Sequence, residues 1–389
     1  MASNAPSDDA PIAEPSQPAP PFRWSFPYRI SVEPRLSEPP RWYPLALTLS
    51  AILVALVIGG LIIAIVGGDP FASYASIAQS SVGSVGVFSD TLVKATPLIL
   101  VGLACSLAFR MKLWNIGAEG QFFLGAFGAS AVVLTPILPA NTSPWIFIPV
   151  MILAGMLFGA LWGFIPGFLK ARYNVNEIIT TLMMNYIAIS WNSFFIYQVW
   201  SEGGFQMSKV FPDHAWLPRL TDLSYMNPKL GGLTVHIGFI FALVMVFVVW
   251  FILYRSRLGY EIRLIGDNPK AARYAGLNVA RNTVIVMMMS GALAGLAGMS
   301  EITGVVHRLQ GAISPGYGFT GIIIAWLAKL NPLVVVLVSV LFGALILAGR
   351  EIQPSGIPKL IQGIILVCLI ASDFMLRYRV RILRVGGEE

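Results

Sequence analysis

The stretch RSRLGYEIRLIGDNPKAARYAGLNVAR, from Arg255 to Arg281, decides how this chain is organised. It holds six Arg or Lys residues against Glu261 and Asp267, whereas the flanking segments 230–254 and 282–300 contain no Asp, Glu, Lys or Arg. Lys and Arg near the ends of membrane spans are retained on the cytoplasmic side. The stretch is therefore predicted to be a cytoplasmic loop between two membrane spans.

A short helix is predicted inside this loop. Asn268 and Pro269 form a start signal, with Asn as the cap and Pro at the first helical position, and Gly276 followed by Asn278 forms a stop signal. The helix would cover 270–275 on the inner face of the membrane. Its small residues would allow another protein to approach closely, and its two larger ones would reach outward. These residues are Ala271, Ala272 and Ala275, and Arg273 and Tyr274.

Composition indicates a membrane protein independently of the loop. Apolar residues make up 56% of the chain and charged residues 12%, the latter about half the share usual in soluble proteins. The formal charge of +7 comes from basic residues concentrated in segments predicted to lie inside, so topology explains it and no nucleic acid partner is indicated. We predict an all-α polytopic fold.

Ten apolar stretches are predicted to cross the lipid bilayer, for which a helix needs about 20 residues. An even number of spans with both termini in the cytoplasm satisfies the charge bias. The predicted spans are 43–66, 88–109, 116–138, 145–169, 176–200, 236–254, 282–304, 317–328, 332–348 and 357–376.

The ends of the chain differ in composition from this transmembrane domain, which covers 43–384. Residues 1–42 are rich in Pro, Ser and Ala and cannot bury enough apolar surface to offset the entropy of ordering, so they are predicted to be a disordered cytoplasmic tail. Residues 385–389 form a short C-terminal tail.

An internal repeat is suggested by LFGAL, which occurs at 157–161 and again at 341–345. The predicted topology runs these two spans in opposite directions. Repeated segments of opposite orientation are typical of transporters, whose substrate path lies near the midplane between the halves.

Polar residues inside the spans are candidate binding residues, because they are unfavourable at membrane depth. Thr181, Asn185 and Asn192 recur at i, i+4 and i+11 and could share one helix face, and Tyr186 could stack on a flat base. Hydrogen bonding between helices is the alternative reading of the same residues. The other candidates are Asn115, Glu119 and Gln121 at the start of the third span, Thr320 and Trp326 in the eighth, and Gln362 in the tenth.

Two charged residues near the outer end of the second span are predicted to have a structural role. Asp90 and Lys94 are four residues apart, a spacing that lets them pair on one helix face at the membrane interface.

Three separated motifs carry a resemblance to a known family. GDNPKAARYAGLNVARNTVIVMMMSGALAGLAG, at 266–298, resembles the coupling loop and following helix of bacterial ABC-importer permeases of the sugar, nucleoside and branched-chain amino-acid type. LWNIGAEGQFFLGAFGA at 113–129 and NEIITTLMMNYIA at 176–188 resemble the branch of that family associated with nucleoside uptake.

The resemblance implies a permease subunit in the bacterial inner membrane, with 43–384 as the permease domain and 255–281 as its coupling loop. It implies three protein partners: a cytoplasmic ATP-binding subunit, a second homologous permease subunit, and an extracytoplasmic solute-binding protein on the outer loops. ATP would be bound by the partner subunit, because the chain contains no G-x-x-x-x-G-K-[ST] motif and is not itself an enzyme. The implied coupling residues are Asp267, Asn268, Pro269, Ala271, Ala272, Arg273, Tyr274, Gly276 and Asn278.

The solute is expected to be small and polar, most plausibly a nucleoside, since neutral amide and hydroxyl groups suit an uncharged solute. Two alternatives stay open: a simple sugar moved by the same kind of permease, or an ion-coupled secondary transporter. Ion coupling would favour paired carboxylates inside the membrane. Only Glu119 and, near span ends, Asp90, Glu301 and Asp373 are available.

Overall fold

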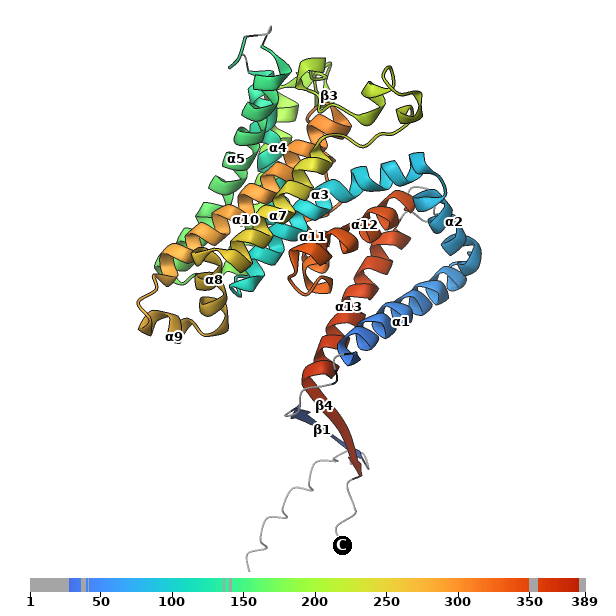
Figure 1. Ribbon diagram of the computed structural model, residues 1–389, viewed down its shortest axis with the longest axis vertical. Helices are drawn as coiled ribbons and strands as arrows, with labels where there is room; N and C mark the ends of the chain where they lie inside the picture. The colour runs from blue at the N-terminus through green and yellow to red at the C-terminus, as the bar shows by residue number, and fades with distance from the viewer. Residues whose placement is uncertain are drawn as a thin grey trace, which may run out of the picture. The chain divides into compact units, whose positions relative to one another are not determined.

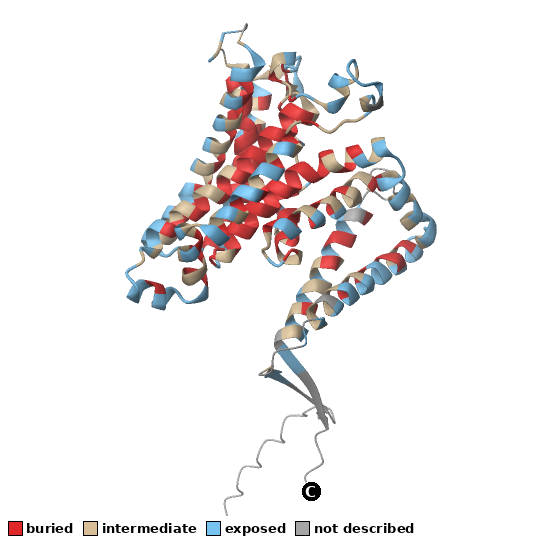
Figure 2. Cartoon of the chain, in the orientation of Figure 1, coloured by how far each residue is buried: buried red, intermediate tan, exposed pale blue. Residues whose placement is uncertain are grey.

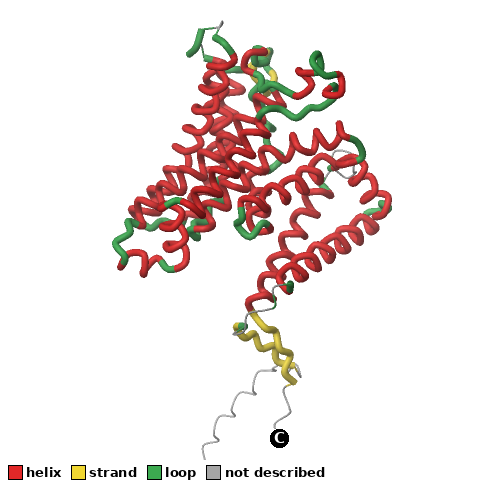
Figure 3. Tube along the Cα trace, viewed as in Figure 1, coloured by secondary structure: helices red, strands yellow, loops and turns green. Residues whose placement is uncertain are grey.

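The computed structural model describes residues 28–35, 40, 42–135, 137–139, 142–349 and 356–384. These residues are mostly helical, as Figure 3 shows. Two compact units are present, one made of the chain ends (1–49 and 370–389) and the other of 50–369. The predicted C-terminal tail, 385–389, and residues 1–27 of the predicted N-terminal tail lie outside the described residues.

The unit made of the chain ends contains a two-stranded antiparallel sheet. Strand β1 (Tyr28–Pro34) pairs with β4 (Tyr378–Arg384), with Ile30 opposite Ile382 and Val32 opposite Val380. The prediction of a disordered tail is therefore wrong for β1. β-branched residues favour strands, and the partner strand that completes the pairing comes from the other end of the chain, which composition alone does not reveal.

The second unit is a helical assembly, and Figure 1 labels its helices except α6. The helices of the chain are α1 (Tyr43–Ile65), α2 (Pro70–Val82), α3 (Val85–Arg110), α4 (Ala118–Leu134), α5 (Pro144–Tyr173), α6 (Glu177–Phe194), α7 (Gly238–Arg255), α8 (Arg257–Asp267), α9 (Pro269–Tyr274), α10 (Val279–Glu301), α11 (Tyr317–Leu327), α12 (Pro332–Ala348) and α13 (Ile357–Arg377). Short π-helical turns extend α6 over Phe195–Val199 and α10 over Ile302–Val306. Short strands β2 (Ser201–Glu202) and β3 (Phe205–Ser208) lie in the predicted outer loop.

Six helices in the described residues are long and apolar enough to cross a membrane: α1, α3, α5, α7, α10 and α13. Three further apolar helices, α4, α11 and α12, are shorter. At 1.5 Å per residue α4 is about 26 Å long and α11 about 17 Å, less than a hydrocarbon core of about 30 Å. The chain is thus a polytopic helical protein, and each predicted span coincides with a helix.

Helices α3 and α10 form the centre of the second unit and are buried along most of their length (Figure 2). α10 packs against α4 and α5, whereas α3 packs against α11 and α12. Each half of the sequence therefore supplies one central helix that packs against a helix pair from the other half.

Glycines allow the closest of these contacts. A Cβ atom on Gly295 of α10 would lie 2.2 Å from the carbonyl oxygen of Gly155 on α5, and one on Gly159 would lie 2.2 Å from that of Gly291. Small residues let helix backbones touch in membranes. Gly155 and Gly159 are four residues apart on α5, as are Gly291 and Gly295 on α10, so each pair lies on one helix face and serves packing.

Candidate functional site

The starts of α4 and α11 meet in the interior of the second unit. The backbone N–H of Gly318 donates to Glu119 Oε2 at 2.6 Å. A Cβ atom on Gly318 would lie only 2.2 Å from the backbone nitrogen of Glu119, so the two backbones touch. A carboxylate is favourable at helix N-termini, where unpaired N–H groups carry partial positive charge. Glu119 therefore ties two short helices together at their starts.

Side chains of α6 form hydrogen bonds with backbone groups at the start of α4. Asn185 Oδ1 accepts from the Gly120 N–H at 2.8 Å, and Asn185 Nδ2 donates to the Ile116 carbonyl at 2.9 Å. Thr181 Oγ1 accepts from the Ile116 N–H at 3.2 Å. Thr181 and Asn185 are buried, so the predicted common face exists, but it is used for hydrogen bonding between helices.

A second network holds α4 against α3 and α10. Asn115 Nδ2 donates to Gln121 Oε1 and to Ser290 Oγ, both at 2.9 Å, and Ser290 donates to the Ala104 carbonyl at 2.7 Å. Asn115 and Gln121 are buried and have partners within the chain. They line neither of the cavities described below.

The remaining candidates of the first half also line neither of the two cavities. Tyr186 is 63% exposed on the outside of α6, so it faces away from the interior. Asn192 is buried, and its Nδ2 donates to the Gln310 carbonyl at 3.4 Å. In the second half, Trp326 stacks on Trp114 with ring centroids 5.7 Å apart.

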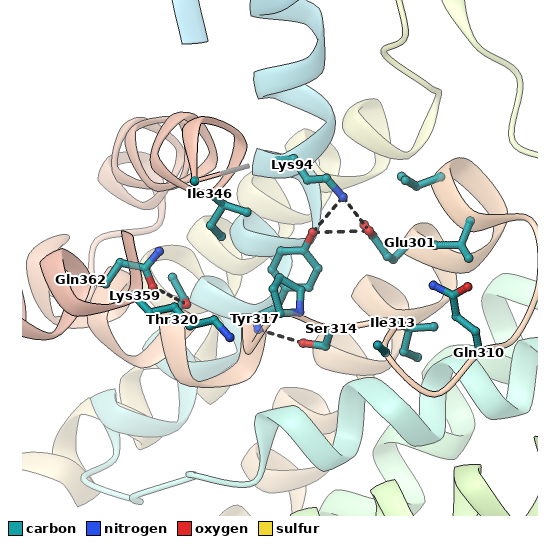
Figure 4. A pocket seen from close by; sticks show the side chains of 15 residues that line it. Lys94, Glu301, Gln310, Ile313, Ser314, Tyr317, Thr320, Ile346, Lys359 and Gln362 are labelled. Carbon is teal, nitrogen blue, oxygen red and sulfur yellow. Dashed lines mark hydrogen bonds and ion pairs between the residues drawn. The ribbon is translucent and has the colours of Figure 1, made fainter. Parts of the chain in front are cut away.

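A cavity of about 490 Å³ opens beside the start of α11 (Figure 4). Of the predicted residues, Thr320 and Gln362 line it, and these two side chains lie 3.4 Å apart. The other polar lining residues are Lys94, Glu301, Gln310, Ser314, Tyr317 and Lys359. This volume is typical of small-molecule sites.

Lys94 donates to Glu301 Oε1 at 2.9 Å and to the Tyr317 hydroxyl at 3.2 Å (Figure 4). The predicted interfacial pair with Asp90 is wrong, because Asp90 instead accepts from Thr234 Oγ1 at 2.5 Å. Spacing on one helix cannot show that another helix offers a carboxylate. The signal that could have identified the pair is a charged residue on each of two apolar helices.

A second cavity of about 260 Å³ adjoins the first. Lys94 and Val305 line both cavities, and the second is also lined by Asp90, Thr234 and Arg219. Arg219 belongs to the predicted outer loop, and Lys94 is one of the two lining residues that the cavities share.

The outer loop is fixed by a cation and a histidine. Arg219 donates to the Gly304 carbonyl at 2.8 Å and contacts His307 Nε2 at 2.5 Å, while Trp216 stacks on His307 at 3.9 Å. Burial, followed by the positive charge of Arg219, lowers the pKa of His307 to about 4. The imidazole is therefore neutral at pH 7 and can accept from the guanidinium.

The loop that contains α9 forms the second candidate site. Asn268 Oδ1 accepts from the N–H groups of Lys270 and Ala271, and Gly276 has φ +78° just after the helix. The predicted short helix is therefore confirmed. Tyr274 is 94% exposed, and the other exposed residues of this site are Asp267, Asn268, Pro269, Lys270, Ala271, Arg273, Ala275, Gly276 and Asn278.

Two details of this loop correct the sequence prediction. Ala272 is fully buried in the chain's own core, so it is not part of the exposed face. Asn278 caps the next helix, since its Oδ1 accepts from the Arg281 N–H at 2.9 Å. A six-residue helix has one face toward its own protein, and capping residues often serve the helix that follows them.

Helix α8, which precedes α9, was not predicted. Ser256 Oγ accepts from the Gly259 N–H at 3.1 Å and caps it. Leu258, Ile262 and Ile265 recur at helical spacing, and the latter two are buried. A serine at the cap position, followed by apolar residues at 258, 262 and 265, is the signal that could have identified the helix.

Long apolar helices, a polar cavity that contains a buried ion pair, and an exposed helical loop together define a membrane transport protein. A model of the family described as "Branched-chain amino acid transport system / permease component" matches residues 87–370. The chain belongs to this family of ABC importer permeases, and it is a multi-pass protein of the inner membrane.

Named relatives agree with this assignment. The chain is 34% identical over 361 residues to the glucose ABC transporter permease protein TsgB13 of Haloferax volcanii, covering 91% of this chain and 94% of the relative. It is 35% identical over 344 residues to the guanosine ABC transporter permease protein NupP of Bacillus subtilis, with 86% and 95% covered. It is 30% identical over 334 residues to the nucleoside ABC transporter permease protein NupB of Lactococcus lactis, with 83% and 88% covered.

Proposed function

We propose that this permease moves a nucleoside into the cytoplasm by ATP-driven alternating access. The observation that carries the proposal is the cavity of about 490 Å³ lined by amide, hydroxyl and paired charged groups, which suit an uncharged polar solute. Two relatives named for guanosine and for nucleosides each align with more than four fifths of this chain. Thr320 and Gln362 are the proposed binding residues from the second half.

A simple sugar is the second candidate, because one relative is named for glucose and aligns with 91% of this chain. Uptake of labelled guanosine and of labelled glucose should be compared in cells with and without the gene for this chain. We expect guanosine uptake to be lost on deletion and glucose uptake to be unchanged. The opposite pattern would refute the nucleoside assignment.

Ion coupling is not favoured, since the relatives named above are all ABC transporter permeases. In vesicles that contain the whole transporter, an uncoupler of ion gradients should leave uptake intact, whereas removing ATP should stop it. Uptake driven by an ion gradient without ATP would overturn the mechanism.

The proposed topology has ten spans with both termini in the cytoplasm. The pairing of β1, just before α1, with β4, just after α13, supports an even number of crossings. The reciprocal packing of α3 and α10 against the helix pair of the opposite half supports an inverted repeat. Residues 43–384 would then be the permease domain.

The exposed face of α9 is proposed to receive force from a cytoplasmic ATP-binding subunit that carries the ATP. Arg273 and Tyr274 are exposed at the end of the helix, and Ala271 leaves room for close approach. The remaining proposed coupling residues are Asp267, Asn268, Pro269, Gly276 and Asn278, which bound the helix. Ala272 supports it from inside.

Arg273→Glu should remove most ATP-coupled uptake without lowering the amount of protein in the membrane, because it alters only an exposed charge. Arg281→Glu is the matched control, since Arg281 is exposed in the first turn of α10, outside α9, and it should leave uptake near wild type. Full uptake by the Arg273 variant would remove α9 from the coupling site.

Two further partners complete the proposed importer. A second homologous permease subunit would cover exposed apolar residues such as Leu153, Leu157 and Phe194, and an extracytoplasmic solute-binding protein would deliver solute to the loop 201–235. Cross-linking of single cysteines placed in that loop to the solute-binding protein would test the contact with this protein. The absence of any cross-linked product would contradict it.

A further inference from the structure

Three charged residues line the cavity beside α11, and two of them, Lys94 and Glu301, form a buried ion pair. The third, Lys359, is exposed. A charged solute beside the buried pair would compete with one of its members for the other, and separating such a pair is unfavourable. The pair therefore favours an uncharged solute.

Lys94 lines both cavities. It lies nine residues inside α3, about 14 Å from the helix start at 1.5 Å per residue, and only 8% of it is exposed. A solute in either cavity would therefore lie close to the Lys94 side chain.

Glu301 has unused hydrogen-bonding capacity at this position. Oε1 accepts from Lys94, whereas Oε2 is buried and has no hydrogen-bond partner among the described residues. A buried polar atom without a partner is destabilising, so a ligand that supplies a donor gains more here than at a satisfied site. The ammonium of Lys94 has three N–H groups, two of which reach Glu301 and Tyr317.

We propose that the Lys94–Glu301 pair recognises two adjacent hydroxyl groups of the solute, such as the 2′ and 3′ hydroxyls of a ribonucleoside or neighbouring hydroxyls of a sugar. One hydroxyl donates to Glu301 Oε2 and the other accepts from Lys94. A vicinal diol offers both a donor and an acceptor without net charge, so it can enter the ion pair without leaving either charge unpaired. This inference rests on the proposed uptake of a nucleoside or sugar.

The test compares uptake of guanosine with that of 2′,3′-dideoxyguanosine in cells that contain the whole transporter. The solute-binding protein also discriminates between these solutes, so the informative quantity is the change of their ratio in a permease variant. Glu301→Gln, which keeps the shape but removes the charge, should lower guanosine uptake about tenfold and dideoxyguanosine uptake less than about twofold, as expected for loss of a hydrogen bond to a charged group.

Controls separate recognition from folding. Glu177→Gln is the matched control, because Glu177 pairs with Lys170 at 3.0 Å but lines neither cavity, and it should not change the ratio. The double variant Lys94→Glu/Glu301→Lys keeps an ion pair and should restore membrane abundance if Glu301→Gln loses it, yet the ratio should stay altered. An unchanged ratio in Glu301→Gln, including an equal loss for both solutes, would overturn the inference.

A second pair of solutes distinguishes failure of the substrate assignment from failure of the diol inference. If the wild type transports glucose but no nucleoside, the proposed substrate is wrong, and the diol inference is then decided by the ratio of glucose to 2-deoxyglucose uptake in the same variants. A wild type that transports neither a nucleoside nor a sugar refutes both proposals.

Discussion

The starts of α4 and α11 are built alike but used differently. Both helices are short, both begin after an irregular segment, and Glu119 joins their backbones. The start of α4 is closed by Asn185, which satisfies two backbone groups at 2.8 and 2.9 Å. The start of α11 faces Gln362 across a single 3.4 Å contact with Thr320 and borders the cavity.

This difference shows that polar residues inside a membrane helix have two distinct uses. Amides whose atoms all point at backbone groups stabilise the fold, whereas amides and charges that face a cavity remain available to a solute. Residue type does not distinguish the two uses. The set of partners within the chain does.

Removing the hydrogen bonds that Asn185 makes at the start of α4 should give the largest loss of stability. Asn185→Leu leaves the Gly120 N–H and the Ile116 carbonyl without partners, and each buried unsatisfied group costs about 1 to 3 kcal/mol. We expect a loss of about 2 to 6 kcal/mol in total, seen as a lower melting temperature of the purified complex and less protein in the membrane. Normal stability with impaired uptake would instead place Asn185 in the solute path.

Separating the two helix starts should have the next largest effect. In Gly318→Ala the new methyl group would meet the Glu119 backbone nitrogen at 2.2 Å, and overpacking of this kind costs about 1 to 3 kcal/mol. Gly363→Ala is the control, because no atom lies within 4 Å of that position. Equal melting temperatures for the two variants would show that the helix starts do not touch.

Changing a residue at the start of α11, which borders the cavity, should affect transport more than stability. Gln362→Leu removes one long contact with Thr320, so we expect less than about 1 kcal/mol of destabilisation but a several-fold decrease in solute uptake per molecule in the membrane. If this variant unfolds as Asn185→Leu does, the two helix starts do not differ as described.

The smallest effect should be pH-dependent and confined to the outer loop above the cavity. The pKa of His307 is lowered to about 4 in the folded protein, below its ordinary value of about 6.5. The folded state therefore gains stability from the neutral imidazole above pH 6.5 and loses it as the pH falls toward 4. Hydrogen exchange of 216–222 should speed up between pH 6.5 and 4 beyond the intrinsic rate change, and His307→Gln should remove that excess. Identical profiles for both proteins would contradict the assignment.

Local sequence signals predicted much of the fold. Apolar stretches predicted where the helices lie, and Asn268, Pro269 and Gly276 predicted α9, because helix capping depends on residues adjacent in the chain. Pairing of Lys94 was predicted wrongly and β1 was missed, because the partners Glu301 and β4 lie 207 and about 350 residues away. Contacts at such separation are not encoded in any local pattern.

The sequence by itself determined that this protein is helical, lies in a membrane, and presents a short exposed helix, since hydrophobicity, charge placement and capping act over a few residues. Only the tertiary structure decided that Asn115, Gln121, Thr181 and Asn185 have partners within the chain while Lys94 and Glu301 face a cavity. The physical reason is that a polar group is available to a solute only when packing leaves it without a full set of partners. Packing is a property of helices brought together from distant parts of the chain.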